Sequence, residues 1–180
     1  MATLIQGLSA TPQNHTSLGE AAKVTVVHAK LGELAFGTSP GTAKVAATLR
    51  AHHTSTMVKL KQRCENYAIA ISKAHGLECR THWEESFPAT QNDSEATDII
   101  IDASKAIGVS NHRLGQPFPW SEDFGHFTNR FKGAMFGLGA GEGCPALHNP
   151  EYDFPDAIIP IGTSMFVSII RKVWSLESDV

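Results

Sequence analysis

Apolar residues recur along the first part of the chain with the periods of helices and strands. Residues 1–11 carry apolar side chains on one side, which predicts a short helix that ends before Pro12. Residues 23–30 are rich in β-branched side chains, and residues 42–50 alternate apolar with polar ones, so both are predicted as strands. The glycines and proline of residues 32–41 predict a turn between them.

A longer helix is predicted over residues 55–74, where an apolar stripe repeats every three or four residues. Thr54 or Ser55 can cap its start, and Gly76 suits a left-handed position after its end. Residues 77–84 follow as another strand. The order helix–strand–strand–helix–strand predicts a ferredoxin-like unit that lacks its first strand. The stripe consists of Met57, Leu60, Cys64, Tyr67, Ala68 and Ile71.

The second half of the chain predicts helices around one buried strand. A helix over residues 95–107 has a polar cap among residues 92–94 and ends at a glycine. Residues 134–138 have the length and composition of a buried strand. The last helix begins around residues 155–161, and its broad apolar face is predicted to be core. The predicted buried side chains are Ile99, Ile100, Ala103 and Ile107 on the first helix, and Ile158, Ile159, Met165, Phe166, Ile169, Ile170 and Val173 on the last.

Composition narrows the class of protein. The 180 residues are 42% apolar, which is enough for one ordinary domain or two small ones. A net charge of −3 gives no basic field for nucleic acid, and no apolar run reaches the ~20 residues of a membrane span. The first residues do not form a signal peptide, and three scattered cysteines suit a reducing compartment. We therefore expect a cytoplasmic protein with neither nucleic-acid nor membrane partners.

A glycine-rich turn and a histidine follow the predicted strand. Gly139, Gly141 and Gly143 alternate with other residues and lack the spacing of a dinucleotide-binding loop, which argues against phosphate binding. His148 follows in a Leu-His-Asn-Pro sequence. A histidine beside a proline, at the end of a loop that leaves a buried strand, is placed as metal ligands often are. Taken alone, it fits an ordinary loop histidine as well.

Two acidic residues before a short predicted helix are also candidates. The helix is predicted to start at Ser121, with Glu122 and Asp123 in its first turn. Acidic residues are favoured there by the helix dipole, which is a purely structural explanation. His126 lies four residues after Glu122 and could share a helix face with it. This spacing makes His126 a candidate for lining a cleft.

Several segments together resemble the C-terminal part of the two-metal amidohydrolases, a family that includes hippurate hydrolase, aminoacylase-like enzymes and auxin–amino-acid-conjugate hydrolases. The matching elements are a Glu-Asp-Phe sequence at residues 122–124, the glycine-bearing strand, the Leu-His-Asn-Pro loop, and an Asp-Phe…Pro-Ile-Gly helix start at residues 153–162. The resemblance implies that His148 is the last metal ligand of a two-metal site. It places Glu122 and Asp123 along the cleft or behind the ligands, where His126 and Asn149 are further candidates.

The resemblance also implies a domain organisation. Residues 1–88 correspond to part of a ferredoxin-like lid or dimerisation domain, and residues 89–180 to the C-terminal part of an α/β catalytic domain like that of zinc peptidases. Residues 32–50 are similar to the central hairpin of the lid. Many relatives have an asparagine associated with substrate where this chain has Gly37, followed here by Thr38. Substrate contact through Gly37 and Thr38 would then use the backbone.

The family mechanism uses two divalent ions, zinc, manganese or similar, together with a glutamate general base and about five or six ligand groups. The motifs that supply most of these groups are not found in this chain. The resemblance implies that the chain begins partway through the lid. We therefore expect no tightly bound metal and no hydrolysis by this chain alone. The intact enzyme would cleave N-acyl amino acids or small peptides, and an exposed strand edge predicts a homodimer. The alternatives are a non-catalytic dimerisation module and an unrelated ferredoxin-like binding protein.

Overall fold

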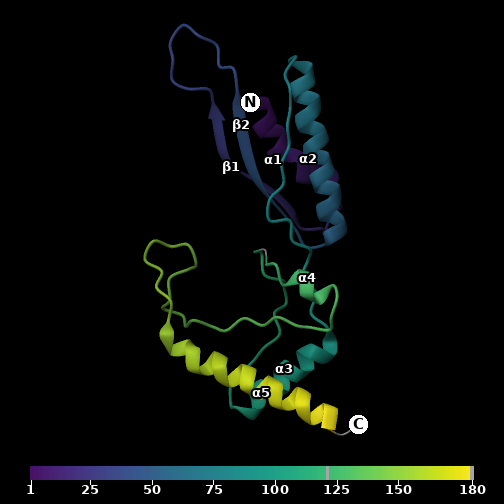
Figure 1. Ribbon diagram of the computed structural model, residues 1–180, viewed down its shortest axis with the longest axis vertical. Helices are drawn as coiled ribbons and strands as arrows, with labels where there is room; N and C mark the ends of the chain where they lie inside the picture. The colour runs from purple at the N-terminus through teal and green to yellow at the C-terminus, as the bar shows by residue number, and fades with distance from the viewer. Residues whose placement is uncertain (121, 179–180) are drawn as a thin grey trace. The chain divides into compact units, whose positions relative to one another are not determined.

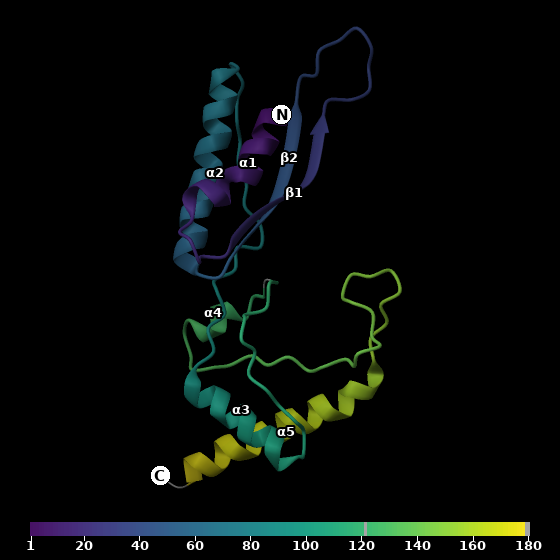
Figure 2. The ribbon, with the colours of Figure 1, turned by 180° about the vertical axis from the view of Figure 1, so that it is seen from behind.

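The computed structural model describes residues 1–120 and 122–178. The chain forms two compact units (Figures 1 and 2). The first consists of Met1–Ala89 with Pro117–Glu122, and the second of Thr90–Gln116 with Asp123–Val180. Each unit has its own helices and is described separately.

The first unit packs two helices against a β-hairpin. Helix α1 (Ala2–His15) is followed by strands β1 (Ala22–Leu31) and β2 (Ala43–Ala51) and by helix α2 (Thr54–Ala74). The strands are antiparallel, with a bulge between Val26 and His28, and both predicted strands are confirmed. Helix α1, helix α2 and the hairpin each contribute side chains to the core, so the helices hold the small sheet in place. It contains Leu8, Val24, Leu60 and Cys64.

Helix α1 continues through Pro12, so its predicted end before that residue is wrong. Proline removes one backbone donor inside a helix. The turns on either side compensate, because the Thr11 hydroxyl donates to the carbonyl of Gly7 at 2.8 Å and the Thr16 amide donates to the carbonyl of Pro12 at 3.0 Å. Thr11 and Pro12 are also buried, so packing holds the last turn that propensity alone would break.

Helix α2 matches its prediction, and Gly76 has the left-handed φ of +67° expected after its end. Neither Thr54 nor Ser55 caps the start of α2 with its side chain. The Thr54 hydroxyl instead accepts a hydrogen bond from the amide of Ala89 at 3.0 Å. Residues 77–84 form no strand, and this prediction is wrong. The segment is anchored by Trp83, which packs on the core and donates its indole N–H to the Glu65 carboxylate on α2. Side-chain contacts with the helix thus take the place of sheet pairing.

The second unit is built on a pair of helices. Helix α3 (Ser94–Ala106) starts at Asp93, whose carboxylate accepts the amide of Ala96 at 3.0 Å. It packs on α5 (Ile159–Ser178), which follows the 3-10 helix η1 (Asp156–Ile158). Ala103 is fully buried at the contact, where the Ser168 hydroxyl donates to its carbonyl at 3.1 Å. Of the predicted buried side of α3, Ala103 is buried and Ile99 and Ile100 are half-buried, whereas Ile107 lies past the last turn and is exposed.

Residues 134–138 are not a strand, contrary to prediction. They lie extended along α5: the rings of Phe136 and Phe166 are 5.8 Å apart, and Gly162 lies close to the side chain of Leu138. The backbone of Met135 is held by the Asn92 side chain, which donates to its carbonyl at 2.8 Å and accepts its amide at 2.9 Å. The side chain of Asn92 therefore bonds where a neighbouring strand would pair.

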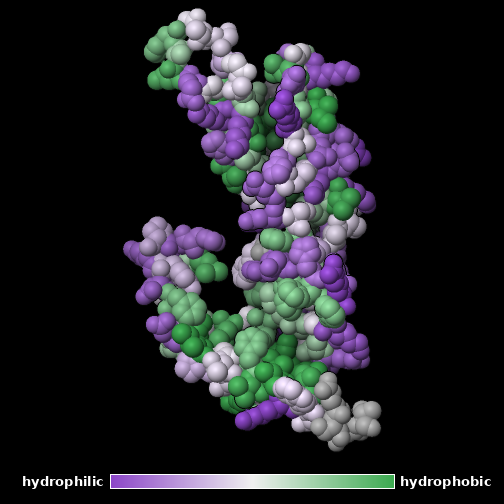
Figure 3. Space-filling view, in the orientation of Figure 1, coloured by the Kyte–Doolittle hydropathy of each residue, from purple (hydrophilic) through white to green (hydrophobic). Residues whose placement is uncertain are grey.

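The apolar face of α5 is not core in this structure, so that prediction is wrong for most of its residues. Met165 is buried and Ile158 and Ile169 are half-buried, while the remaining predicted residues are exposed. Figure 3 shows hydrophobic residues gathered over this helix. By length and composition alone, Asp156–Ser175 passes the test for a membrane span, as a core helix also does. The exposed residues of the predicted face are Ile159, Phe166, Ile170 and Val173.

Candidate metal-ligand loop

His148 is the third residue of the first of two consecutive tight turns. In the first, the Asn149 amide donates to the carbonyl of Ala146 at 3.0 Å. In the second, the Tyr152 amide donates to the carbonyl of Asn149 at 2.9 Å, with Pro150 at the position where its fixed φ suits a turn. The Asn149 side chain also accepts the amide of Glu151 at 2.8 Å. The Asn-Pro pair thus stiffens the backbone that carries the histidine.

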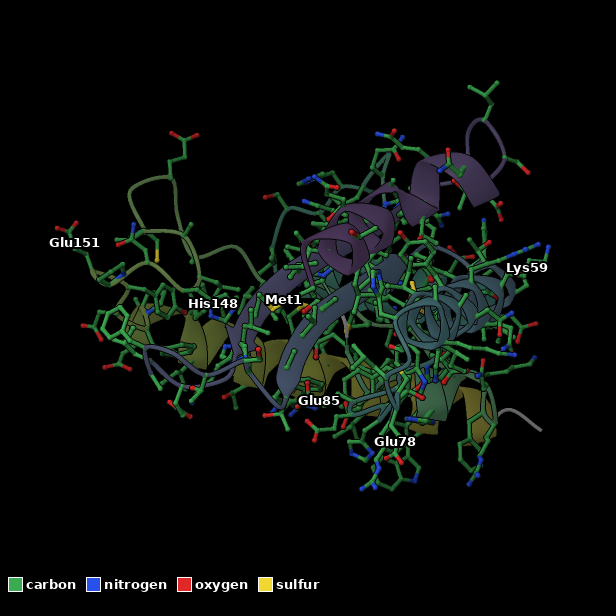
Figure 4. All side chains as sticks on the ribbon, turned by 90° about the horizontal axis from the view of Figure 1, so that it is seen from above. Met1, Lys59, Glu78, Glu85, His148 and Glu151 are labelled. Carbon is green, nitrogen blue, oxygen red and sulfur yellow. The ribbon has the colours of Figure 1, made fainter. Side chains whose placement is uncertain are left out.

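The backbone of His148 is left-handed, with φ at +68°. That value belongs to the third residue of a type II turn, where glycine is usual and a larger residue costs about 1–2 kcal/mol. The imidazole is exposed, so burial among apolar side chains does not explain this conformation. Figure 4 labels His148 and Glu151 on this loop, which precedes α5. The turns present an open imidazole from a fixed backbone, as a metal ligand requires.

One imidazole does not complete a metal site. Structural zinc sites have four protein ligands, and catalytic sites have about three with a water. Within residues 1–120 and 122–178, no group of three or more His, Cys, Asp and Glu side chains is arranged to hold an ion. The donors in the described part of the chain therefore do not fit a complete two-metal centre. They offer at most one corner of it.

Glu122, Asp123 and His126 lie around a helix shorter than predicted. Helix α4 spans only Gly125–Thr128, and the predicted start at Ser121 lies outside the described residues. Both carboxylates precede the helix, so helical spacing does not set where Glu122 and His126 face. Asp123 contributes its carbonyl to the start of α4, accepting the amide of His126 at 2.9 Å. Glu122 belongs to the first unit, whereas Asp123 and His126 belong to the second with His148.

Gly37 and Thr38 lie in the connection between β1 and β2. Gly37 has a positive φ of +80°, and nothing lies within contact distance of the place where a Cβ would be. The glycine is therefore required by the backbone conformation of the loop rather than by close packing. Thr38 beside it is exposed. Both residues are open to solvent in the first unit, where the hairpin loop carries them.

Asn92 and Glu95 position the segment that leads to the histidine loop, and the pattern of the sequence did not single them out for it. Besides the two bonds from Asn92 to Met135, the Asp93 amide donates to the carbonyl of Gly133 at 2.9 Å. Lys132 pairs with the Glu95 carboxylate at 2.6 Å, and this contact raises the pKa of Lys132. Four polar contacts thus tie residues 132–135 to the start of α3.

A groove in the second unit lies away from the histidine loop. It measures about 930 Å³ and runs between α3 and α5, with Ile99 and Val167 among its apolar lining and Asp102 and Arg171 among its charged lining. None of the predicted site residues lines it. The groove therefore does not add a ligand or a general base to the histidine loop.

The chain is similar to several hydrolases in sequence. A probable hydrolase of Synechocystis (sll0100) is 28% identical over 83% of this chain, and an N-acetyldiaminopimelate deacetylase of Oenococcus oeni is 27% identical over 68%. The hippurate hydrolase of Campylobacter jejuni is 27% identical over 77%. These matches cover 40%, 32% and 36% of the three relatives, so the chain spans well under half of their length.

A solved structure shows the same fold. A crystal structure assigned as an aminohydrolase from methicillin-resistant Staphylococcus aureus superposes with a TM-score of 0.68 at 18% sequence identity. The match covers 94% of this chain and 44% of that one. The expected mixed α/β fold, with a small antiparallel sheet beside helices, is confirmed by this likeness.

The sequence profile described as Peptidase family M20/M25/M40 matches residues 8–172, which is nearly the whole chain. The match begins in α1 and ends in α5, so both compact units are parts of the family fold. Members of the family are hydrolases that generally depend on two metal ions, and the resemblance to two-metal amidohydrolases is confirmed. This chain belongs to Peptidase family M20/M25/M40.

Proposed function

We propose that the chain is the C-terminal portion of a metal-dependent amidohydrolase that cleaves the amide bond of N-acyl amino acids or similar small amides. The family match over residues 8–172 carries this proposal. Two of the relatives are named for removing an acyl group from the nitrogen of an amino acid, as an N-acetyldiaminopimelate deacetylase and a hippurate hydrolase. The substrate class follows from these names and not from the identity of any pocket in this chain.

In this proposal, His148 is a ligand of one of two divalent ions, zinc, manganese or similar. Its exposed ring and left-handed backbone support the role, because a ligand must reach an ion without moving its backbone. Asn149 would help to hold the His148 imidazole in place, because its side chain and carbonyl fix the turn that follows the histidine. When bound, the ions would polarise the amide carbonyl and lower the pKa of water.

The other candidates have supporting roles. Asp123, just before α4, and His126, within it, are exposed and would line the cleft or orient ligands. Glu122, which is also exposed, would have the same kind of role. Gly37 and Thr38, which are both exposed, would contact substrate through the hairpin loop, with a backbone amide in place of an asparagine side chain. The remaining ligands and the general base would come from the part of the fold that this chain does not span, so the isolated chain should be inactive.

Residues 1–88 would serve as part of the lid and dimerisation domain, and residues 89–180 as part of the catalytic domain. The β1–β2 sheet supports the first assignment, because each of its two strands pairs on one side only within the described residues. A strand edge of this kind is a template for pairing, and we propose a homodimer through it in the cytoplasm. The same observation favours the second candidate function, a non-catalytic dimerisation module.

A hybrid protein tests the proposal. The matched part of the Synechocystis hydrolase is replaced by this chain, and release of amino acid from N-acetyl amino acids and hippurate is measured with added Zn²⁺ or Mn²⁺. We expect metal-dependent hydrolysis by the hybrid and none by the isolated chain. A folded, metal-loaded hybrid that cleaves none of these amides would refute the proposed function and favour the non-catalytic module.

A further inference from the structure

The groove of about 930 Å³ lies between α3 and α5, two helices that pack on each other (Figures 1 and 2). Ser168, which is buried at their contact, also lines the groove and forms part of its base. Elsewhere on α5, Phe166 contacts Phe136. The groove residues Val167 and Arg171 lie about 100° and 140° further around the helix. The groove is therefore separate from the apolar face around Phe166.

Part of the groove lining is apolar. Ile99 of α3 is half-buried there, while Ile107 at the end of α3 is 37% exposed and Val167 of α5 is 41% exposed. The volume falls within the range of roughly 300–1,000 Å³ that is usual for small-molecule sites, which combine a mostly apolar lining with a few polar groups. The groove is thus large enough for a small molecule with an apolar body.

The carboxylates of the groove already have partners. Three of them line the α3 wall, and each pairs with a lysine or arginine that does not itself line the groove. The pairs join Glu95 to Lys132 at 2.6 Å, Asp98 to Arg113 at 2.8 Å and Asp102 to Lys105 at 3.2 Å. They leave the α3 wall without uncompensated negative charge.

Two cations on the α5 wall have no such partner. Arg171 is exposed and Lys172 is half-buried, and neither side chain makes an ion pair or hydrogen bond within residues 1–120 and 122–178. The helix dipole does not account for them, because it favours cations in the last turn and both lie more than a turn before Ser178, where α5 ends. The groove therefore combines uncompensated positive charge with an apolar lining.

This combination identifies the chemistry of a ligand. We propose that the groove binds an amphipathic carboxylate, a molecule with a carboxylate head and an apolar chain or ring. The head pairs with Arg171, whose guanidinium can hold both carboxylate oxygens, and with the ammonium of Lys172. The apolar body lies along Ile99, Ile107 and Val167. A neutral molecule would leave the cations without a partner, and a short anion such as acetate would not cover the apolar lining.

This site is independent of the proposed amide hydrolysis. His148 and the residues around it do not line the groove, and the metal ions of the proposed function play no part in it. An inactive hybrid protein would sink the proposed function and leave the groove site standing. A failure of carboxylate binding would overturn only the groove site.

Octanoate is the probe for the test, and it is titrated into the 180-residue chain. Calorimetry measures the affinity, and backbone amide chemical shifts map the contact. Acetate has the same head without the chain, and octylammonium has the same chain with the opposite charge. Arg171→Gln and Lys172→Gln remove the cations, and Arg171→Lys keeps the charge. Arg63→Gln on α2 is the matched control, because Arg63 is also an exposed arginine without an ion pair in the described part of the chain.

We expect one octanoate to bind per chain, with the largest amide shifts at Ile99, Val167 and Arg171. Acetate and octylammonium should bind at least about tenfold more weakly. Arg171→Gln and Lys172→Gln should each weaken octanoate binding by about fivefold or more, as expected for one lost charge pair. Arg171→Lys should lose less than Arg171→Gln, and Arg63→Gln should stay within about twofold of the unchanged chain.

Circular dichroism establishes that each variant is folded. Equal affinity for octanoate and octylammonium would overturn the inference, because the cations would then play no part. Titration without saturation would also overturn it, as would amide shifts centred on Ile159 and Ile170 in place of the groove. Equal losses of affinity in Arg171→Gln and Arg63→Gln would contradict the assigned position of the carboxylate.

Discussion

Replacing Asn92 by alanine should release residues 134–138 from the start of α3. The side chain makes two hydrogen bonds to the backbone of Met135, at 2.8 and 2.9 Å. Each bond is worth about 0.5–1.5 kcal/mol net, and exposure of Asn92 to water places the pair toward the low end of that range. We expect the variant to lose about 1–2 kcal/mol of local stability.

Hydrogen exchange measures this effect directly. A loss of about 1.4 kcal/mol corresponds to roughly tenfold faster exchange through local opening, and it should appear at Met135, whose amide the Asn92 side chain accepts. Asn92→Asp keeps the acceptor and loses the donor, so its effect should be intermediate. Gln91→Ala changes an adjacent exposed side chain and serves as the control. Equal exchange at Met135 in Asn92→Ala and Gln91→Ala would refute the view that Asn92 bonds in place of a neighbouring strand.

Three further predictions concern the first unit. Leu60→Ala should destabilise it by about 2–5 kcal/mol in chemical denaturation, because Leu60 is 2% exposed, whereas Leu34→Ala, at a 91% exposed position, should cost under about 0.5 kcal/mol; equal costs would contradict the assigned core. The hydrogen bond from Thr56 lowers the pKa of Glu20 below its ordinary 4.5, so its contribution to stability is present above pH 4.5 and is lost as the pH falls through the lowered value. Thr56→Val should make the free energy of unfolding depend less on pH below 4.5. An unchanged pH dependence in this range would count against the hydrogen bond. Burial raises the pKa of the Cys64 thiol, so Ellman's reagent should modify it more slowly than the other two cysteines, and equal rates would disprove this.

The helices and the hairpin could be predicted because their signals are local. The apolar stripe of α2 has the period of a helix, and the β-branched residues of β1 favour a strand. Gly76 follows the end of α2 with a left-handed backbone, and the Asp93 side chain caps the start of α3. Where the sequence misled, contacts distant in the chain decided the outcome. Burial carries α1 past Pro12, and Trp83 holds its segment on α2 instead of in the sheet.

The strand at residues 134–138 and the core face of α5 show a different limit. Their composition predicts burial, yet residues 134–138 are only half-buried apart from the exposed Gly137, and most of the α5 face is exposed. A hydrophobic pattern reports that a surface is to be buried but does not identify what covers it. At the histidine loop, the Leu-His-Asn-Pro sequence singled out His148 as a candidate ligand. The left-handed backbone of His148 became visible only in the structure.

The metal content of the hybrid with the Synechocystis hydrolase tests the central claim most directly. His148→Ala is compared with His112→Ala, which removes another exposed imidazole of the second unit. If His148 is a ligand of one ion in a two-metal site, the purified hybrid should carry about two ions per chain, and the His148 variant should lose about one of them, or at least tenfold in metal affinity. The His112 variant should keep both. A His148→Ala hybrid that is folded and retains its full metal content would contradict the account.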